Sequence, residues 1–175
     1  EGEVLENLHA NANSSMAIGY RNRLIKERLH FYLGAQYTSY GSIGSDSSTM
    51  NFVAWHVHYG GAEAGLDLKL FRLGKAVFYL KSGASASLLV KGYQLINAEV
   101  LSLQDQDDFQ GPLIMFNTGA VIEFPIIKQL AAYAQYSRGK SLSLISNASN
   151  LTSQETLIIN NEQLSFGLRF KLPTN

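Results

Sequence analysis

Hydrophobic and polar residues alternate with a period of two along most of the chain, and helical periodicity is nearly absent. The closing segment, QLSFGLRFKL at 163–172, sets Leu164, Phe166 and Leu168 against Ser165 and Gly167 without a break. Such runs predict about eight β-strands and an all-β fold. The expected strands are Ser14 to Arg21, Leu29 to Ser39, Asn51 to Tyr59, Ala62 to Phe71, Val77 to Lys91, Leu113 to Phe124, Leu130 to Ser137 and Glu162 to Leu172.

The strand count depends on Gly60-Gly61, where the apolar set changes from odd to even positions. Val53, Trp55, Val57 and Tyr59 precede the pair, and Ala62, Ala64, Leu66, Leu68 and Leu70 follow it. A Gly-Gly hairpin turn and a β-bulge within one long strand both produce such a change of phase. With a bulge, seven strands are visible, and a first strand is expected before residue 1 or within the poorly patterned residues 4–13.

The connections between the expected strands fall into two classes that alternate along the chain. Short connections at 22–28, 72–75 and 125–129 are accompanied by basic residues, whereas long connections at 41–49, 93–110 and 139–160 are rich in Ser, Asn, Gln and Asp. Short turns at one rim and long polar loops at the other are typical of outer-membrane barrels.

The two faces of the expected strands differ in bulk and polarity. One carries Phe31, Leu33, Phe78, Leu80, Phe116, Phe124, Phe166, Leu168 and Phe170, and the other is small, polar or charged, with Gly34, Gly65, Gly83, Gly119 and Gly167 recurring on it. Glycine weakens a solvated strand but makes room on a crowded barrel axis. We therefore expect the bulky residues to face lipid, with a network of paired charges closing the lumen: Glu63, Asp67, Lys69, Lys81, Glu123 and Arg169. Aromatic girdles are expected from Tyr20, Tyr37, Tyr59, Phe71, Phe78, Phe124 and Tyr136.

Composition agrees with a chain whose surface lies partly outside water. Charged residues make up 16% of the 175 residues, below the roughly 25% of an average soluble domain. Lys+Arg 14 balances Asp+Glu 14, which disfavours nucleic acid as a partner. Cysteine is absent, which excludes thiol catalysis and cysteine metal sites, and no apolar run reaches the roughly 18 residues of a transmembrane helix.

Three segments resemble a known family, the small outer-membrane β-barrel proteins of the PorT-like and OmpA-type kind. They are HYGGAEAGLDLKLFRLGKAVFYLKSGASASLLVKG at 58–92, FNTGAVIEFPIIKQLAAYAQYSRG at 116–139 and the closing LSFGLRFKL. The resemblance implies an antiparallel up-and-down transmembrane β-barrel with short periplasmic turns and long external loops. Such barrels usually end on an aromatic residue, whereas here Phe170 is followed by Lys171, Leu172 and PTN.

These features predict one barrel domain at 14–172, preceded by an indistinct segment at 1–13 and followed by a tail at 173–175. The expected function is that of a monomeric, non-enzymatic component of the bacterial outer membrane. The lumen would be plugged and without a cofactor or metal, and the long loops would bind another envelope protein, a secretion component or an external ligand. No catalytic motif is present.

Two alternatives remain open. The first is a soluble lipocalin-like barrel that binds an apolar ligand in a cavity lined by Phe31, Phe78, Phe116 and Phe166. The second is a lipid-modifying barrel enzyme that uses His56 or His58, whose spacing of two residues places both on one face of a strand and also permits metal chelation. A non-catalytic role for the two histidines near the rim is the simpler expectation.

Overall fold

The computed structural model describes residues 9–10, 13–26, 28–46, 51–97, 99–104, 111–142, 144–145 and 156–171. Its seven long strands are β2 (Ser15–Ile25), β3 (Leu29–Asp46), β4 (Asn51–Leu73), β5 (Ala76–Ile96), β7 (Leu113–Ile127), β8 (Leu130–Ser141) and β11 (Asn160–Phe170). The short strands are β1 (His9–Ala10), β6 (Glu99–Ser102), β9 (Leu144–Ile145) and β10 (Thr156–Leu157). Among these residues, no helix has the length and apolar character needed to cross a membrane.

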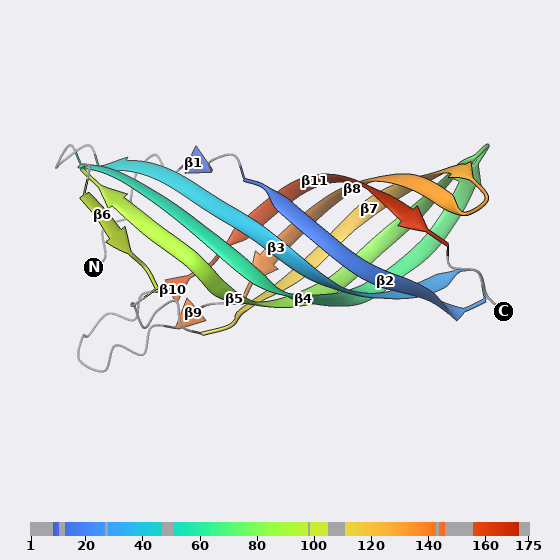
Figure 1. Ribbon diagram of the computed structural model, residues 1–175, viewed down its shortest axis with the longest axis horizontal. Coiled ribbons are helices and arrows are strands. Elements are labelled where there is room, and N and C mark those ends of the chain that lie inside the picture. The colour runs from blue at the N-terminus through green and yellow to red at the C-terminus, as the bar shows by residue number, and fades with distance from the viewer. Residues whose placement is uncertain are drawn as a thin grey trace.

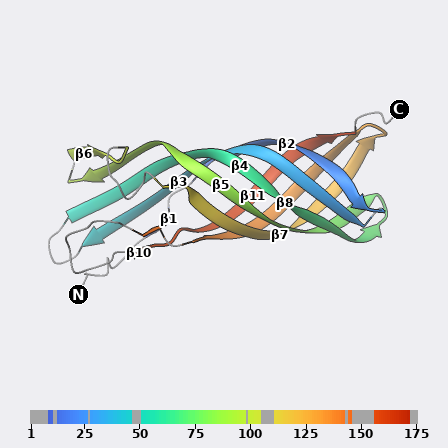
Figure 2. The same ribbon diagram turned by 90° about the horizontal axis from the view of Figure 1, so that it is seen from below.

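The long strands form one antiparallel sheet in the order β2-β3-β4-β5-β7-β8-β11, so each pairs with its neighbour along the chain. The sheet curls so that its two edge strands, β2 and β11, approach each other along an open seam (Figures 1 and 2). This is the expected up-and-down β-barrel architecture. In the described part of the chain, no strand pairing joins β2 to β11, and the sheet remains open along that seam.

The two ends of the barrel differ as the connections predict. The turns β2–β3, β4–β5 and β7–β8 are short and lie at one end, together with the end of β11 (Figure 1). In the β4–β5 turn, Gly74 takes a φ of +60°, which favours glycine. The opposite end carries β6, β9 and β10. Most of the expected loop at 41–49 instead extends β3, and its last residues lie outside the described part.

The hairpin-turn interpretation of Gly60-Gly61 was wrong, and the alternative of one long strand is confirmed, although the bulge lies on the neighbouring strand β5 and not at the glycine pair itself. β4 runs through the pair, and its register with β3 is continuous from Tyr37 opposite Gly60 to Gln36 opposite Gly61. Odd positions of β4 point inward on both sides of the pair, as Tyr59 and Asp67 show by their burial. The pattern changes because the interior itself changes from polar to apolar at this level. The register shift lies on β5, where Val90 is the extra residue between Leu89 and Lys91.

Burial shows which face of the sheet lies inside. Along β11 the even positions are exposed and the odd positions partly buried in strict alternation. Phe166 and Phe170 are 73% and 72% exposed, whereas Asp67 and Glu123 are 1% and 7% exposed. The polar, glycine-containing face therefore lines the lumen, and the bulky apolar face points outward.

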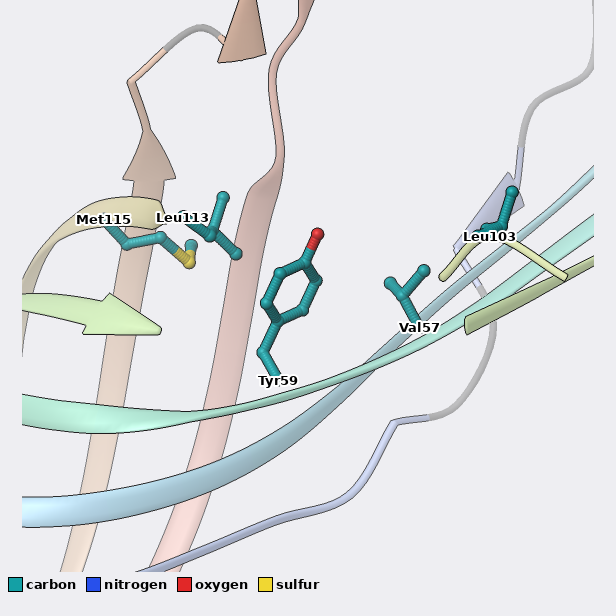
Figure 3. Packing of buried hydrophobic residues seen from close by; sticks show 5 residues of the cluster. All are labelled: Val57, Tyr59, Leu103, Leu113 and Met115. Carbon is teal, nitrogen blue, oxygen red and sulfur yellow. The ribbon is translucent and has the colours of Figure 1, made fainter. Parts of the chain in front are cut away.

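A compact apolar cluster fills the lumen at the long-loop end. Val57 and Tyr59 of β4 meet Leu113 and Met115 of β7 and Leu103, which follows β6 (Figure 3). Tyr59 is 2% exposed and points inward, so the expectation that it belongs to an outer aromatic girdle was wrong. The other six aromatic residues of that set lie at outward-facing positions of their strands.

Candidate functional site

Four charged side chains from four different strands meet in the lumen towards the short-turn end. Arg21 of β2 and Arg169 of β11 both contact Asp67 of β4 and Glu123 of β7. The Arg21 Nε to Asp67 Oδ2 distance is 2.7 Å, and Arg169 Nη1 donates a hydrogen bond to Glu123 Oε2 at 2.6 Å. The two weaker contacts are Arg21 Nη1 to Glu123 Oε2 at 3.3 Å and Arg169 Nη2 to Asp67 Oδ2 at 3.4 Å. The four formal charges sum to zero, which is what burial inside a barrel requires.

Aromatic rings hold the two guanidinium groups in place. The guanidinium carbon of Arg21 lies 4.4 Å from the ring centre of Tyr79, and that of Arg169 lies 4.7 Å from the ring centre of Tyr133. Tyr79 packs with Val77 and Val121 in a small buried cluster against which Tyr133 rests. Charge pairing and cation–π contact thus both restrict the arginines, and the network links β2 and β11 to β4 and β7 across the lumen.

The structure brings together three of the six expected lumen charges, namely Asp67, Glu123 and Arg169. Lys81 is the cross-strand neighbour of Asp67 on β5, and its ammonium donates to Gln135 Oε1 at 3.3 Å and sits 4.0 Å from the ring centre of Tyr32. Glu63 lines the same part of the lumen. Lys69 is at an inward-facing, partly buried position nearer the short turns, where its backbone N–H donates to the carbonyl of Arg28.

Sequence reasoning missed Arg21 as a member of the network, because a basic residue at an expected strand end resembles an ordinary turn residue. β2 instead continues to Ile25, four residues beyond its expected end. The signal was present in the alternation of Ser15, Ala17 and Gly19 with bulkier residues. Arg21 is the next alternate position after Gly19, so the same alternation places its side chain in the lumen.

A polar cavity of about 310 Å³ lies between the charge network and the apolar cluster. Polar side chains dominate its wall, including Gln36, Thr38, Glu63, Lys81, Ser85, Asn117, Gln135 and Ser137. It also reaches the seam, where Ser15, Ala17, Ser165 and Gly167 contribute to its lining.

Tyrosine side chains, rather than the charged side chains expected from the sequence, lie over three of the five lumen glycines, namely Gly65, Gly83 and Gly167. A Cβ added to Gly65 would lie 2.6 Å from the hydroxyl of Tyr32, and one added to Gly83 would also collide with that hydroxyl. The ring of Tyr133 covers Gly167 in the same way. These three glycines therefore leave the space that the side chains of Tyr32 and Tyr133 occupy.

The apolar cluster closes the other end of the lumen through a fold-back of the chain after β6. The backbone N–H of Leu103 donates to the carbonyl of Gly92 at 3.0 Å, and a Cβ on Gly92 would lie 3.2 Å from the Cβ of Leu103. The absence of a side chain at Gly92 thus provides the space in which Leu103 packs. Tyr40 packs against this cluster, beyond the outer apolar band. Burial raises the pKa of its phenol to about 12.

His56 and His58 do share one face of β4, but that face is the outer one, near the long-loop end. Each stacks on a tyrosine: His56 on Tyr93 with ring centres 5.1 Å apart, and His58 on Tyr37 at 5.8 Å. The described residues contain no group of three or more His, Asp or Glu side chains arranged to hold a metal. These contacts are those of structural rim residues.

The four phenylalanines of the lipocalin-like alternative occupy outward positions. Phe116 and Phe166 are 55% and 73% exposed, and Phe31 and Phe78 lie on the same outer face. Phe31 meets Tyr20 edge to face there, and Phe78 stacks on Phe71 with ring centres 4.6 Å apart. The cavity in the lumen is polar instead, so these residues do not form an internal site for an apolar ligand.

The sequence matches no protein-family model and no curated protein.

Proposed function

We propose that the chain is a transmembrane β-barrel of the bacterial outer membrane, with a closed lumen and no enzymatic activity, that acts as a structural or interaction component of the envelope. The observation that carries the proposal is an inverted distribution of polarity. The interior holds a four-charge network and a polar cavity, while the exterior carries a continuous set of large apolar side chains.

The size of the apolar exterior supports a lipid environment. Phe116, Phe124, Phe166 and Phe170 are each 49–73% exposed. With about 150–250 Å² for each aromatic residue, these four alone expose roughly 500 Å². That equals the largest apolar patch of a typical soluble monomer, and the leucines of the same face add to it. Exposing this apolar surface to water is strongly unfavourable, whereas lipid acyl chains are apolar and can contact it without this cost.

Strand length supports the same proposal. The shortest of the seven long strands have 11 residues, and tilted strands of 9–11 residues cross a bilayer. On β4 the band of exposed apolar positions begins at Ala62 and continues to Leu73, and the strand extends for 11 residues beyond this band in the other direction, to Asn51. Because β3 and β5 continue with it, a paired platform projects past the band at the long-loop end. This platform and its loops would form the surface that binds an envelope partner or an external ligand.

The closed lumen disfavours a channel function. Arg21, Asp67, Glu123 and Arg169 cross it at one end, and the cluster around Tyr59 fills it at the other. The intervening cavity lies between two barriers of different chemistry. We therefore expect no steady ion conductance when the protein is inserted in a planar lipid bilayer.

Depth-dependent fluorescence quenching tests the membrane location directly. In a Trp55→Phe background, which removes the single native tryptophan, Phe166→Trp would report on the centre of the outer face. We expect strong quenching by lipids brominated along the acyl chain. Tyr93→Trp, at the His56 contact beyond the band, is the matched control and should be quenched weakly. A protein that folds as a monomer without detergent or lipid, with neither probe quenched, would overturn the proposal. Heat-modifiable migration on SDS gels provides an independent check of barrel formation.

A further inference from the structure

Basic and acidic residues are sorted between the two ends of the sheet. The segments 26–28, 72–75, 125–129 and 171–175 connect or follow strands at the short-turn end, and Glu27 is their one acidic residue. The same segments contain six basic residues, which we call the basic rim: Lys26, Arg28, Arg72, Lys75, Lys128 and Lys171. The long connections at 41–49, 93–110 and 139–160 have the reverse balance, with Lys140 as their one basic residue and six acidic ones: Asp46, Glu99, Asp105, Asp107, Asp108 and Glu155. The net charge of zero therefore conceals a separation of charge along the length of the sheet.

The charges of the basic rim are not neutralised by described residues of the chain. All six side chains are exposed, and within the described ranges none of them forms a salt bridge. Arg21 and Arg169 differ in this respect, because both are paired with carboxylates in the lumen. The counter-charge for the basic rim must then come from outside the part of the protein that the structure describes.

The basic rim is spread around the end of the sheet and is not gathered on one side. Figure 1 shows the three short turns and the end of β11 at the same end. Each turn carries one or two of the six cations, and Lys171 follows β11. Successive turns are two strands apart, which corresponds to roughly 10 Å at the usual strand spacing. A partner that surrounds the barrel fits this distribution better than a compact molecule that docks on one side.

Large apolar side chains adjoin every part of the basic rim. Lysine and arginine can lay their aliphatic stems along such a surface while the charged group extends beyond it. No polar zone separates the apolar surface from the cations at these four places. The adjoining apolar residues, each more than half exposed, are Ile25 before Lys26, Leu73 between Arg72 and Lys75, Ile127 before Lys128 and Phe170 before Lys171.

We propose that the basic rim binds the phosphate groups of anionic phospholipids in the leaflet that the short turns reach. The inference rests on the proposed function, since it takes the apolar exterior to lie in a bilayer. A phospholipid supplies both partners that the rim requires, because its phosphate accepts charge-assisted hydrogen bonds while its acyl chains contact the adjoining apolar side chains. A zwitterionic lipid carries its own cation beside the phosphate and leaves the charges of the rim without a counter-charge. Each Lys or Arg near an anionic surface strengthens the association roughly fivefold.

Lipid-selective quenching in reconstituted vesicles tests the proposal. In the Trp55→Phe background, Leu73→Trp places a reporter between Arg72 and Lys75. The vesicles consist of phosphatidylcholine with a minor fraction of either brominated phosphatidylglycerol or brominated phosphatidylcholine, and the two quenching efficiencies give the relative affinity for the anionic lipid. We expect a preference of about five- to tenfold for phosphatidylglycerol at low salt, which should decrease as salt screens the charges.

Two controls separate the basic rim from the rest of the surface. Leu164→Trp places the reporter on the outer face of β11, two residues nearer the long-loop end than Phe166, where Glu162 and Arg138 neutralise each other. This reporter should show no preference between the two lipids. At the Leu73→Trp reporter, Arg72→Gln/Lys75→Gln should remove most of the preference, whereas Lys140→Gln should leave it unchanged.

The possible outcomes distinguish this inference from the proposed function. Equal quenching of Leu73→Trp by both lipids would overturn the inference alone, because the quenching itself would place the reporter in the bilayer. A preference that persists in Arg72→Gln/Lys75→Gln would also overturn it. Unlabelled lipid A carries phosphates as well, and if it relieved the quenching by brominated phosphatidylglycerol better than unlabelled phosphatidylglycerol does, the rim would bind that lipid instead. If neither lipid quenched either reporter, the proposed function would fail and the inference with it.

Discussion

Replacement of Asp67 by asparagine is the sharpest test of the charge network. The amide has nearly the shape of the carboxylate but no charge, and Asp67 is 1% exposed, so solvent cannot replace the lost interaction. The change leaves Arg21 and Arg169 with Glu123 as their shared carboxylate and gives the network a net positive charge.

The contacts set the expected magnitude. Breaking a fully buried ion pair typically costs about 3–5 kcal/mol. Here both arginines keep Glu123, and their side chains are 17% and 20% exposed, so water relieves part of the penalty. We expect Asp67→Asn to lower the free energy of unfolding by about 2–3 kcal/mol, a value that combines the buried-pair cost with charged hydrogen bonds of about 1.5–3 kcal/mol.

The assay is reversible urea unfolding of the protein folded in detergent micelles or lipid vesicles. Glu162→Gln is the matched control, because Glu162 contacts Arg138 at 3.6 Å with the two side chains 61% and 74% exposed. An exposed pair of this kind contributes at most about 1 kcal/mol. In addition, Asp67→Asn/Arg21→Met should be more stable than the sum of its single changes predicts, by about 1–2 kcal/mol. If Asp67→Asn proved as mild as Glu162→Gln, or if the double variant were simply additive, the network would not brace the barrel.

Three further predictions concern packing and closure. Gly167→Ala should lower the free energy of unfolding by about 1–3 kcal/mol, since its Cβ would lie 2.5 Å from the hydroxyl of Tyr133. In denaturant unfolding, the same substitution should cost less in a Tyr133→Ala background. An equal cost in both backgrounds would contradict the contact. Leu103→Ala should cost about 2–4 kcal/mol because Leu103 is 1% exposed, whereas Leu101→Ala, at a side chain 43% exposed, should cost far less in the same assay. The unmodified protein should show no steady conductance in planar bilayers, and regular single-channel steps would contradict a lumen closed at both ends.

The interior of the curled sheet has two chemical zones. At the level of Asp67 the wall holds charges that satisfy one another, and beyond Tyr59 it holds apolar residues that exclude water. The bulge at Val90 lies at the boundary, where the side-chain amide of Gln104 donates to the Val90 carbonyl at 2.6 Å. The chain beyond β6 is thereby fixed in the position from which Leu103 enters the mouth.

The sequence by itself determined the strands and their two faces. Strict alternation predicted β11, and the recurrence of glycine among polar residues correctly indicated that the polar face lies inside. Both properties are local, because the pleat sends neighbouring side chains to opposite sides of a sheet. The polar phase also marked Asp67, Glu123 and Arg169 as lumen residues.

Only the tertiary structure decided what those faces meet. Arg21 joins the network because curling the sheet brings β2 opposite residues 46 and 102 positions further along the chain, a proximity that no local pattern encodes. The change of phase at Gly60-Gly61 was compatible with a hairpin turn or with a bulge in one long strand, and the structure shows one strand whose pairing with β3 is continuous through the pair. An alternating pattern records the polarity of each environment but not the course of the strand. Where the interior changes from polar to apolar, the apolar residues of β4 change from even to odd positions, although the odd positions face inward throughout.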